Sequence, residues 1–308
     1  MNPLQSSIQP CLVVAFAIIM STIPVLAQEK GKTNKKKKGL QIPEGVEVIR
    51  DLKYAKNGIA RQKLDLYLPK NRGDKKLPVV LWIHGGGWLN GSKDKCKAAF
   101  LATKGFAVAS VGYRLTDQAQ WPGQIDDLYT AVHWLRVHGK NYQLDGDHIG
   151  AWGSSAGGHL AALLGTRKYT GLEEVSSRVQ AVCDWFGPTD LLIMPPNVVS
   201  EKRTLEQVSK SNGAKLLGKT VRDVPELAKD ASAFYQIDER DPPFLIMHGS
   251  EDPGVPLEQS RKFHDALQAA GVESEFVIVE GAGHGGAEFN TGEVQEKVRA
   301  FFAKHLQK

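Results

Sequence analysis

The chain has 308 residues, of which 42% are hydrophobic and 24% are charged, a composition ordinary for a soluble globular protein. This length suits one large α/β domain. The formal net charge is +5, but six lysines and one glutamate within residues 28–42 account for all of it. Because the remainder is close to neutral, we expect no basic groove for nucleic acid.

Residues 1–27 have the features of an export signal. Their apolar stretch, 11–27, is broken by Pro24 and ends in "VLA", which fits a cleavage site. No Lys or Arg precedes it and the positive charge follows it, opposite to the usual bias, so an uncleaved anchor is the alternative. We expect a cleaved signal peptide, a secreted or periplasmic protein and no stable membrane insertion afterwards. Residues 28–42 would then be a solvated Lys-rich linker, or alternatively an anchor to an acidic polymer or membrane.

Residues 43–308 are predicted to form one domain with an α/β fold. Two stretches with alternating apolar residues, "VEVIRDLKYA" and "RQKLDLYLP", predict an antiparallel pair of strands at its start. Continuous apolar runs predict buried strands at 77–85, 105–115, 148–153, 179–187, 242–249 and 273–281. Helical patterns occur at 124–139, 156–165, 255–271 and 291–306. This alternation indicates a mostly parallel central sheet covered by helices on both faces.

Residues 188–241 depart from this alternation. They contain no strong strand pattern and only weak helical ones, and they are too many for a plain connection between two core strands. We predict a small helical lid, inserted at the carboxyl edge of the sheet, and not a second domain.

The mature chain would retain two cysteines, Cys96 and Cys183. They could pair in an oxidising compartment. Because Cys96 comes just after a glycine loop and Cys183 lies within an apolar strand pattern, we expect two free thiols.

A glycine loop, "HGGGW", follows the first long buried strand at residues 84–88. Ligands and catalytic groups of parallel sheets collect at such strand ends. Glycines leave backbone N–H groups unshielded, and such amides can stabilise the oxyanion of an acyl transfer. A phosphate-binding loop is the alternative, but the Gly-Lys-Ser/Thr sequence that it needs is absent.

The sequence "GSSAG" at residues 153–157 stands between a predicted strand and a predicted helix. This is the arrangement of a nucleophilic serine, and the middle residue of the G-x-S-x-G pattern is Ser155, not Ser154. Gly153 and Gly157 would be required because neighbouring segments come too close for a Cβ atom. The amide of Ala156, at the start of the helix, would also face the oxyanion.

A serine needs a base that is itself oriented by an acid. Of the nine histidines, His284 stands out because it follows the last predicted strand and is surrounded by glycines. The preceding strand is followed by Glu251 and Asp252. We favour Asp252 because Pro253 fixes the loop directly after it, and Glu251 is the alternative.

Five motifs, "HGGGW", "GSSAGGH", "DWFGPTDL", "HGSEDPGVPLEQS" and "GAGHG", resemble the α/β-hydrolase superfamily over residues 43–308. The nearest resemblance is to the esterase/lipase group that includes feruloyl esterases, acetyl-xylan esterases and hormone-sensitive-lipase-like carboxylesterases. The resemblance implies the α/β-hydrolase fold and an acyl-serine mechanism, with Ser155 as nucleophile, His284 as base and acid, and Asp252 orienting His284. The oxyanion amides that it implies are Gly85, Gly86 and Ala156.

Three aromatic residues, Trp88, Trp185 and Phe186, could form walls of the substrate pocket, or they could pack against the lid. We expect no cofactor and no metal site, because no cluster of His, Cys and Asp has convincing ligand spacing.

The expected function is hydrolysis of a small-molecule or polysaccharide ester, such as an acetyl or feruloyl group on a carbohydrate. Two alternatives remain open. A prolyl-oligopeptidase-like peptidase shares the fold and the order of the triad, and would need a propeller domain upstream. A non-catalytic hydrolase fold used as a binding module would not need an intact triad.

Overall fold

The computed structural model describes residues 42–168 and 176–307. The predicted signal peptide lies outside these residues, as does the Lys-rich segment apart from Ile42. Within them, no helix combines the length and the apolar character needed to cross a membrane.

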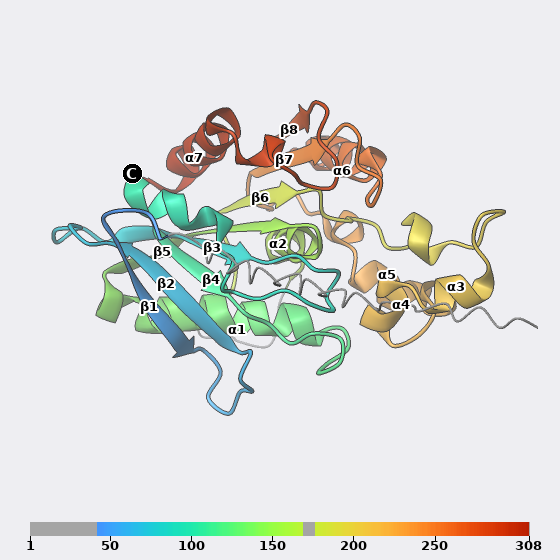
Figure 1. The fold of residues 1–308 in the computed structure, drawn as a ribbon, viewed down its shortest axis with the longest axis horizontal. Helices are drawn as coiled ribbons and strands as arrows, with labels where there is room; N and C mark the ends of the chain where they lie inside the picture. The colour runs from blue at the N-terminus through green and yellow to red at the C-terminus, as the bar shows by residue number, and fades with distance from the viewer. Residues whose placement is uncertain (1–41, 169–175, 308) are drawn as a thin grey trace, which may run out of the picture. The chain divides into compact units, whose positions relative to one another are not determined.

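One eight-stranded sheet forms the centre of the fold, in the order β1-β2-β4-β3-β5-β6-β7-β8 (Figure 1). Strand β2 pairs antiparallel with both β1 and β4, and the remaining neighbours are parallel, which confirms the predicted sheet. The strands are β1 (Val46–Lys53), β2 (Lys63–Pro69), β3 (Leu77–Ile83), β4 (Ala107–Val111), β5 (Leu144–Ser154), β6 (Ala181–Trp185), β7 (Phe244–Gly249) and β8 (Ser274–Val279). The central strands β3, β4 and β6 are buried along their whole length, as doubly covered strands should be.

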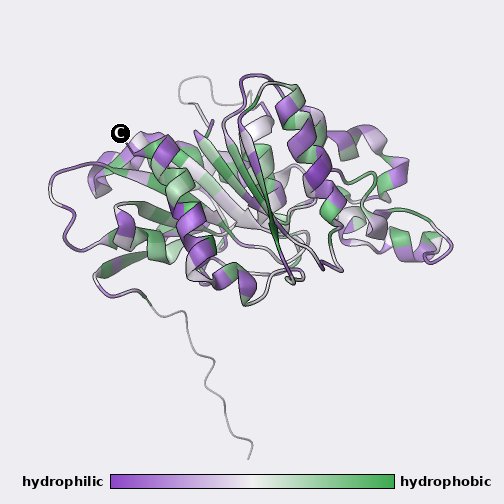
Figure 2. Ribbon diagram, turned by 90° about the horizontal axis from the view of Figure 1, so that it is seen from above, coloured by the Kyte–Doolittle hydropathy of each residue, from purple (hydrophilic) through white to green (hydrophobic). Residues whose placement is uncertain are grey.

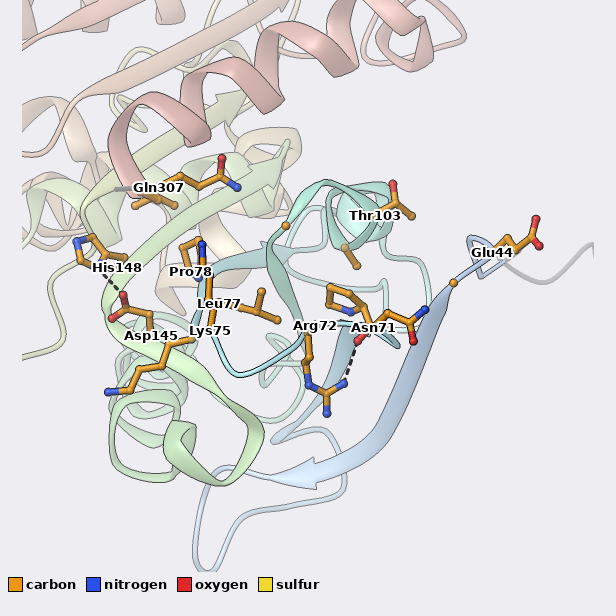
Figure 3. A pocket seen from close by; sticks show the side chains of 16 residues that line it. Glu44, Asn71, Arg72, Lys75, Leu77, Pro78, Thr103, Asp145, His148 and Gln307 are labelled. Carbon is orange, nitrogen blue, oxygen red and sulfur yellow. Dashed lines mark hydrogen bonds and ion pairs between the residues drawn. The ribbon is translucent and has the colours of Figure 1, made fainter.

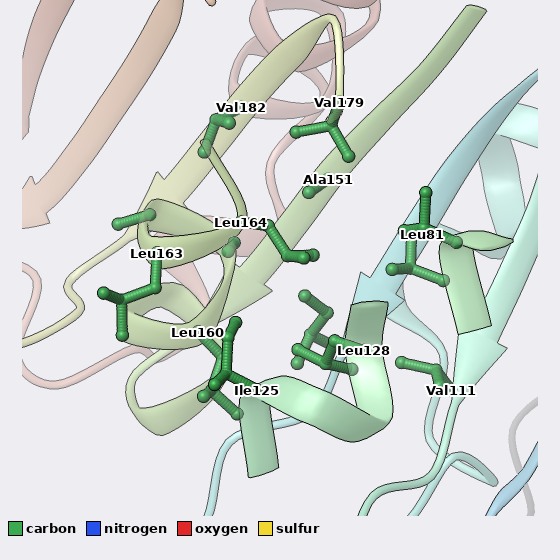
Figure 4. Close-up of a cluster of buried hydrophobic side chains, with 14 of the residues drawn as sticks. Leu81, Val111, Ile125, Leu128, Ala151, Leu160, Leu163, Leu164, Val179 and Val182 are labelled. Atoms are coloured by element: carbon green, nitrogen blue, oxygen red, sulfur yellow. The ribbon is translucent and has the colours of Figure 1, made fainter. Parts of the chain in front are cut away.

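Helices cover both faces of this sheet. One face packs against α1 (Gly123–His138), α2 (Ala156–Thr166) and α6 (Leu257–Ala269). The other packs against the 3₁₀ helix η1 (Lys97–Lys104) and α7 (Gly292–Leu306). Figure 4 shows leucines of α1 and α2 meeting aliphatic residues of the strands. In Figure 2 the inner strands are mostly green or white, whereas the outer helices also carry purple, hydrophilic residues.

The four helices predicted from periodicity are confirmed, and η1 is an addition to them. The segment that forms η1, "KAAFLATK", is short and ends at Gly105, whose φ of 85° closes the turn. So short a segment offers too few turns for a helical period to stand out.

The two cysteines lie in the second hydrophobic cluster, on the face covered by η1 and α7. Both are buried and free, which confirms the sequence-based expectation. Burial raises the pKa of the Cys96 thiol to about 12.

The insertion, residues 188–241, is built from short helices and one isolated bridge. Its α-helices are α3 (Leu205–Ser209), α4 (Asn212–Leu217) and α5 (Pro225–Asp230), and its 3₁₀ helices are η3 (Pro195–Asn197), η4 (Val221–Asp223) and η5 (Ala233–Gln236). The bridge pairs Ser200 with Arg203. In Figure 1, α3, α4 and α5 gather at one end of the sheet. The insertion is tied to the core by the Trp121 Nε1–H, which donates to Asp230 at 2.7 Å, and by Gln259 of α6, which accepts from the amides of Thr189 and Asp190. It therefore packs on the domain; its action as a lid stays a prediction.

Candidate active site

The turn between β5 and α2 consists of Ser155 alone. Its φ of 55° and ψ of −124° are unusual for a residue with a side chain and cost about 1–3 kcal/mol. The conformation is held because the Ser155 amide donates to the Trp185 carbonyl at 2.8 Å, and the Ser155 carbonyl accepts from the His159 amide at 2.9 Å. These two hydrogen bonds hold Ser155 just beyond the end of β5, where it lines a cavity.

Glycines on both sides make this turn possible. A Cβ atom on Gly153 would overlap the carbonyl of Gly157, and one on Gly157 would overlap the carbonyl of Ile83 in β3. These atoms are backbone and cannot move aside independently. The steric reason predicted for both glycines is therefore correct.

The structure brings Ser155, His284 and Asp252 together from the ends of β5, β8 and β7. The Ser155 hydroxyl lies 2.8 Å from His284 Nε2, and His284 Nδ1 lies 2.6 Å from Asp252 Oδ2. In this arrangement the Nδ1–H donates to the carboxylate, and Nε2 is free to accept the serine proton. Glu251, the alternative acid, is exposed and its side chain takes no part in these contacts.

The carboxylate of Asp252 is buried, and hydrogen bonds from protein N–H groups take the place of water around it. It accepts from the amides of Gly254 at 2.7 Å and Val255 at 2.9 Å. Burial opposes its ionisation, but hydrogen bonds from His248, His284 and the two amides outweigh that effect and hold the pKa of Asp252 well below its usual range. Asp252 is therefore an anion at neutral pH.

A second histidine contacts the same carboxylate, and the sequence assigned no role to it. His248 is fully buried at the end of β7, and its Nε2 lies 3.2 Å from Asp252 Oδ2 and 2.9 Å from the Val255 carbonyl. Its Nδ1 accepts from the Ser260 hydroxyl at 2.7 Å. The one sequence signal was its place at a strand's carboxyl end, four residues before Asp252.

The glycine loop after β3 lies directly against the serine. A Cβ atom on Gly85 would stand 2.6 Å from the Ser154 carbonyl oxygen. The ring of His84 is stacked on Tyr113, and its Nδ1–H donates to the Gly85 carbonyl at 2.8 Å. Burial lowers the pKa of His84 to about 4, so this ring is neutral. Because C=O and N–H point in opposite directions in a trans peptide, the amide of Gly86 is directed away from His84.

A cavity of about 710 Å³ opens in front of Ser155 and His284. Gly85, Gly86 and Ala156 line it together with the serine. The insertion contributes further lining residues, namely Leu191, Met194, Pro196, Asn197, Arg203, Gln207 and residues 210–213. The residues predicted to supply the nucleophile and the oxyanion amides therefore line the same cavity.

Two of the three predicted pocket aromatics, Trp88 and Phe186, line this cavity. Phe186 also packs against the His284 ring, with centroids 4.9 Å apart. Trp88 donates from Nε1 to His159 Nδ1 at 3.2 Å, and His159 Nε2–H donates to the Ala231 carbonyl of the insertion at 2.7 Å. The two alternatives for Trp88, a wall of the pocket and packing against the insertion, are therefore compatible: it lines the cavity and reaches the insertion through His159.

The prediction for Trp185 is wrong. Its indole is fully buried against Trp152 and Phe289, with ring centroids 4.8 and 5.1 Å away, on the face covered by α7. Side chains alternate along β6, so Val182 points to the opposite face while Cys183 and Trp185 share this one. Trp185 is a core residue.

A second cavity, of about 720 Å³, is as large as the first but lies elsewhere (Figure 3). Leu77, Pro78 and Asp145 line it, so it lies where β3 and β5 begin, at the edge opposite Ser155. His148 faces it, paired through Nδ1 with Asp145 at 2.7 Å. Among the described residues that line it there is no serine or cysteine. The chemistry therefore identifies the first cavity as the candidate active site. In residues 42–168 and 176–307, no group of three or more His, Cys, Asp or Glu is placed to hold a metal ion.

Proteins of known sequence and structure resemble this chain along most of its length. Esterase LipC of Mycobacterium tuberculosis is 32% identical over 73% of this chain and 57% of its own length. A truncated carbohydrate esterase from gut microbiota superposes with a TM-score of 0.75 and 30% identity, over 85% of this chain and 97% of the other. The bifunctional GH43-CE protein of Bacteroides eggerthii has a TM-score of 0.75 and 33% identity, over 83% of this chain and 35% of the other. The chain spans about half the length of the curated relatives that it matches.

The model of one protein family, BD-FAE, matches residues 64–267. This range contains the glycine loop, the serine turn and Asp252, and ends before His284. With its mostly parallel sheet, its covering helices and its esterase neighbours, the fold is that of the α/β-hydrolases, and the chain is a member of the BD-FAE family.

Proposed function

We propose that this protein is a serine carboxylic ester hydrolase with Ser155 as its nucleophile. The observation that carries the proposal is the continuous hydrogen-bonded series from Ser155 through His284 to Asp252, at 2.8 and 2.6 Å. The esterase names of its relatives support it.

The reaction begins when the Ser155 hydroxyl attacks the ester carbonyl and His284 Nε2 takes its proton. The oxygen that becomes negative is stabilised by the amides of Gly85 or Gly86 and Ala156. His284 then returns the proton to the leaving alcohol, which departs and leaves an acyl-serine. Water, deprotonated by the same histidine, releases the acid and restores the serine.

The substrate that we propose is a carbohydrate-linked ester, such as an acetyl or feruloyl group on a sugar. The carbohydrate esterase named among the structural neighbours supports this class, and so does an open cavity of about 710 Å³ in front of Ser155. The features of residues 1–27 support export as a further proposal, which would bring the enzyme to polysaccharides outside the cell.

The nucleophile is tested with a fluorophosphonate probe and 4-nitrophenyl acetate. Ser155→Ala is expected to abolish labelling and to lower kcat by about three orders of magnitude or more. Ser154→Ala is the matched control, because the neighbouring serine should leave labelling intact. Labelling that survives Ser155→Ala would refute the assignment.

The substrate class is tested on acetylated xylan, a feruloylated sugar and simple 4-nitrophenyl esters. We expect kcat/KM for at least one carbohydrate ester to exceed that for 4-nitrophenyl acetate after correction for leaving-group reactivity. Hydrolysis of the simple esters alone would overturn the carbohydrate proposal and leave the esterase proposal standing.

A further inference from the structure

Charge is distributed one-sidedly around the candidate active-site cavity. Among the described residues that line it, the ionisable side chains other than His284 are Lys97, Arg203 and Lys210, and Asp and Glu do not occur. We propose that this cavity selects esters that carry a carboxylate away from the bond that is cleaved, with Lys97 and Arg203 as the groups that recognise it. The inference rests on the proposed function and specifies its substrate: within the carbohydrate esters, it points to saccharides that contain uronic acid.

The three cationic side chains differ in whether a carboxylate already pairs with them. Lys210 forms an ion pair with Glu206 at 2.6 Å. Across residues 42–168 and 176–307, no carboxylate lies within ion-pair distance of Lys97 or Arg203. Two positive charges of the cavity are thus available to an incoming anion.

The surroundings of Lys97 favour an anion. Its ammonium lies 5.5 Å from the centroid of the Trp185 ring. Burial lowers the pKa of Lys97, because the partial loss of water is not offset by an opposite charge. A carboxylate bound beside it would supply that charge.

Arg203 belongs to a different element. It comes from the insertion, two residues before α3 begins, and is partly buried. Its neighbour Lys202 is exposed and is not among the described residues that line the cavity. A guanidinium presents paired N–H donors that match the two oxygens of a carboxylate. Lys97 and Arg203 are far apart in the sequence but line the same cavity. Folding alone therefore brings their two positive charges together.

Apolar side chains complete the lining. Trp88, Phe186 and Met194 provide apolar contacts for a hydrocarbon acyl group or the face of a sugar ring. The carboxylate could belong to the alcohol or to the acyl part of the ester, so the experiment has one arm for each.

In the alcohol arm, 4-acetoxybenzoate is compared with its neutral counterpart 4-acetoxybenzamide. In the acyl arm, monophenyl adipate is compared with its neutral terminal amide. The quantity measured is the ratio of kcat/KM for the charged ester to that for the neutral ester, so a general loss of activity in a variant cancels.

We expect a ratio of about ten in at least one arm for the wild-type protein, since an ion pair of this kind contributes roughly three- to tenfold per cation. Lys97→Gln and Arg203→Gln should each lower the ratio about three- to tenfold. Lys202→Gln, the matched control, should leave it unchanged. High salt should reduce the wild-type ratio through screening.

A wild-type ratio near one in both arms overturns the proposal, as does a ratio that Lys97→Gln and Arg203→Gln both leave unaltered. If the neutral esters are still hydrolysed in a Ser155-dependent manner, only the anion preference has failed. If no ester is hydrolysed and the fluorophosphonate probe does not label Ser155, the esterase proposal itself has failed, and this one with it.

Discussion

At the scale of single residues, Asp184 is an ionisable group that the proposed reaction does not use. It is fully buried on β6, and its Oδ1 accepts from the Gly187 amide at 2.9 Å. Its Oδ2 has no hydrogen-bond partner among the described residues. Burial raises the pKa of Asp184 from 3.8 to about 6, although the Gly187 amide and the nearby His248 act in the opposite direction.

The sign of the resulting pH dependence follows from this raised pKa. Below pH 3.8 the carboxyl is protonated in both the folded and the unfolded state, so its full contribution to stability is present. That contribution is lost as the pH rises toward about 6, because the unfolded chain ionises first. Above that pH the folded protein carries a buried, half-partnered carboxylate.

Asp184→Asn should therefore stabilise the protein at neutral pH. The side chain keeps its shape and its acceptor for Gly187 but never ionises, so the free energy of unfolding should rise by up to about 3 kcal/mol at pH 7.5. The gain should largely vanish at pH 4. Urea unfolding at both pH values measures it, with the exposed Asp117→Asn as control. A gain that is independent of pH would contradict this explanation.

At the scale of secondary-structure elements, the packing of α2 against β3 and β5 sets the position of the serine. Gly157, in the first turn of α2, leaves no room for a Cβ atom because the carbonyls of Ile83 and His84 occupy that space. A shift of the helix would move Ser155 relative to both His284 and the glycine loop.

Gly157→Ala tests this contact. We expect the free energy of unfolding to fall by about 1–3 kcal/mol from overpacking. We also expect labelling by the fluorophosphonate to slow about 100-fold, because displacements near 1 Å disrupt catalysis to that extent. Gly292→Ala in α7 is the control, since its Cβ would meet nothing within 4 Å. Equal labelling rates for the two variants would show that the serine turn tolerates the shift.

At the scale of the whole molecule, the insertion and the sheet domain are joined by Asp230. Its carboxylate accepts from the Trp121 indole at 2.7 Å and pairs with Arg167 at 3.1 Å. This contact lies between an insertion helix and the chain leading into α1, so its loss should loosen the insertion without unfolding the sheet.

Asp230→Ala should accelerate amide hydrogen exchange in residues 204–236 while the strands stay protected. A lost hydrogen bond of this kind leaves the buried Trp121 N–H unpaired and costs about 1–3 kcal/mol locally. KM should rise, since the insertion supplies part of the cavity wall. The control is Asp223→Ala, whose exposed pair with Arg222 is 3.8 Å long. Exchange that does not differ from the wild type would show that Asp230 is not an anchor.

Much of this protein was predictable because its determinants are local. Strand and helix positions follow from the spacing of apolar residues, and the serine turn follows from the glycines on either side of it. The order in which Ser155, Asp252 and His284 occur along the chain, each after a predicted strand, was enough to place them at one edge of a parallel sheet.

What tertiary structure alone decided depends on contacts between distant segments. The sequence favoured Asp252 and left Glu251 as the alternative, and the contact of the His284 ring with Asp252 decided between them. His248 was found only because β7 directs it at the same carboxylate. Trp185 was misassigned because a short apolar run does not tell which side chains face which layer. The sequence by itself determined the elements and their chemical groups; strand register and side-chain direction, set by packing across more than 100 residues, decided which groups meet.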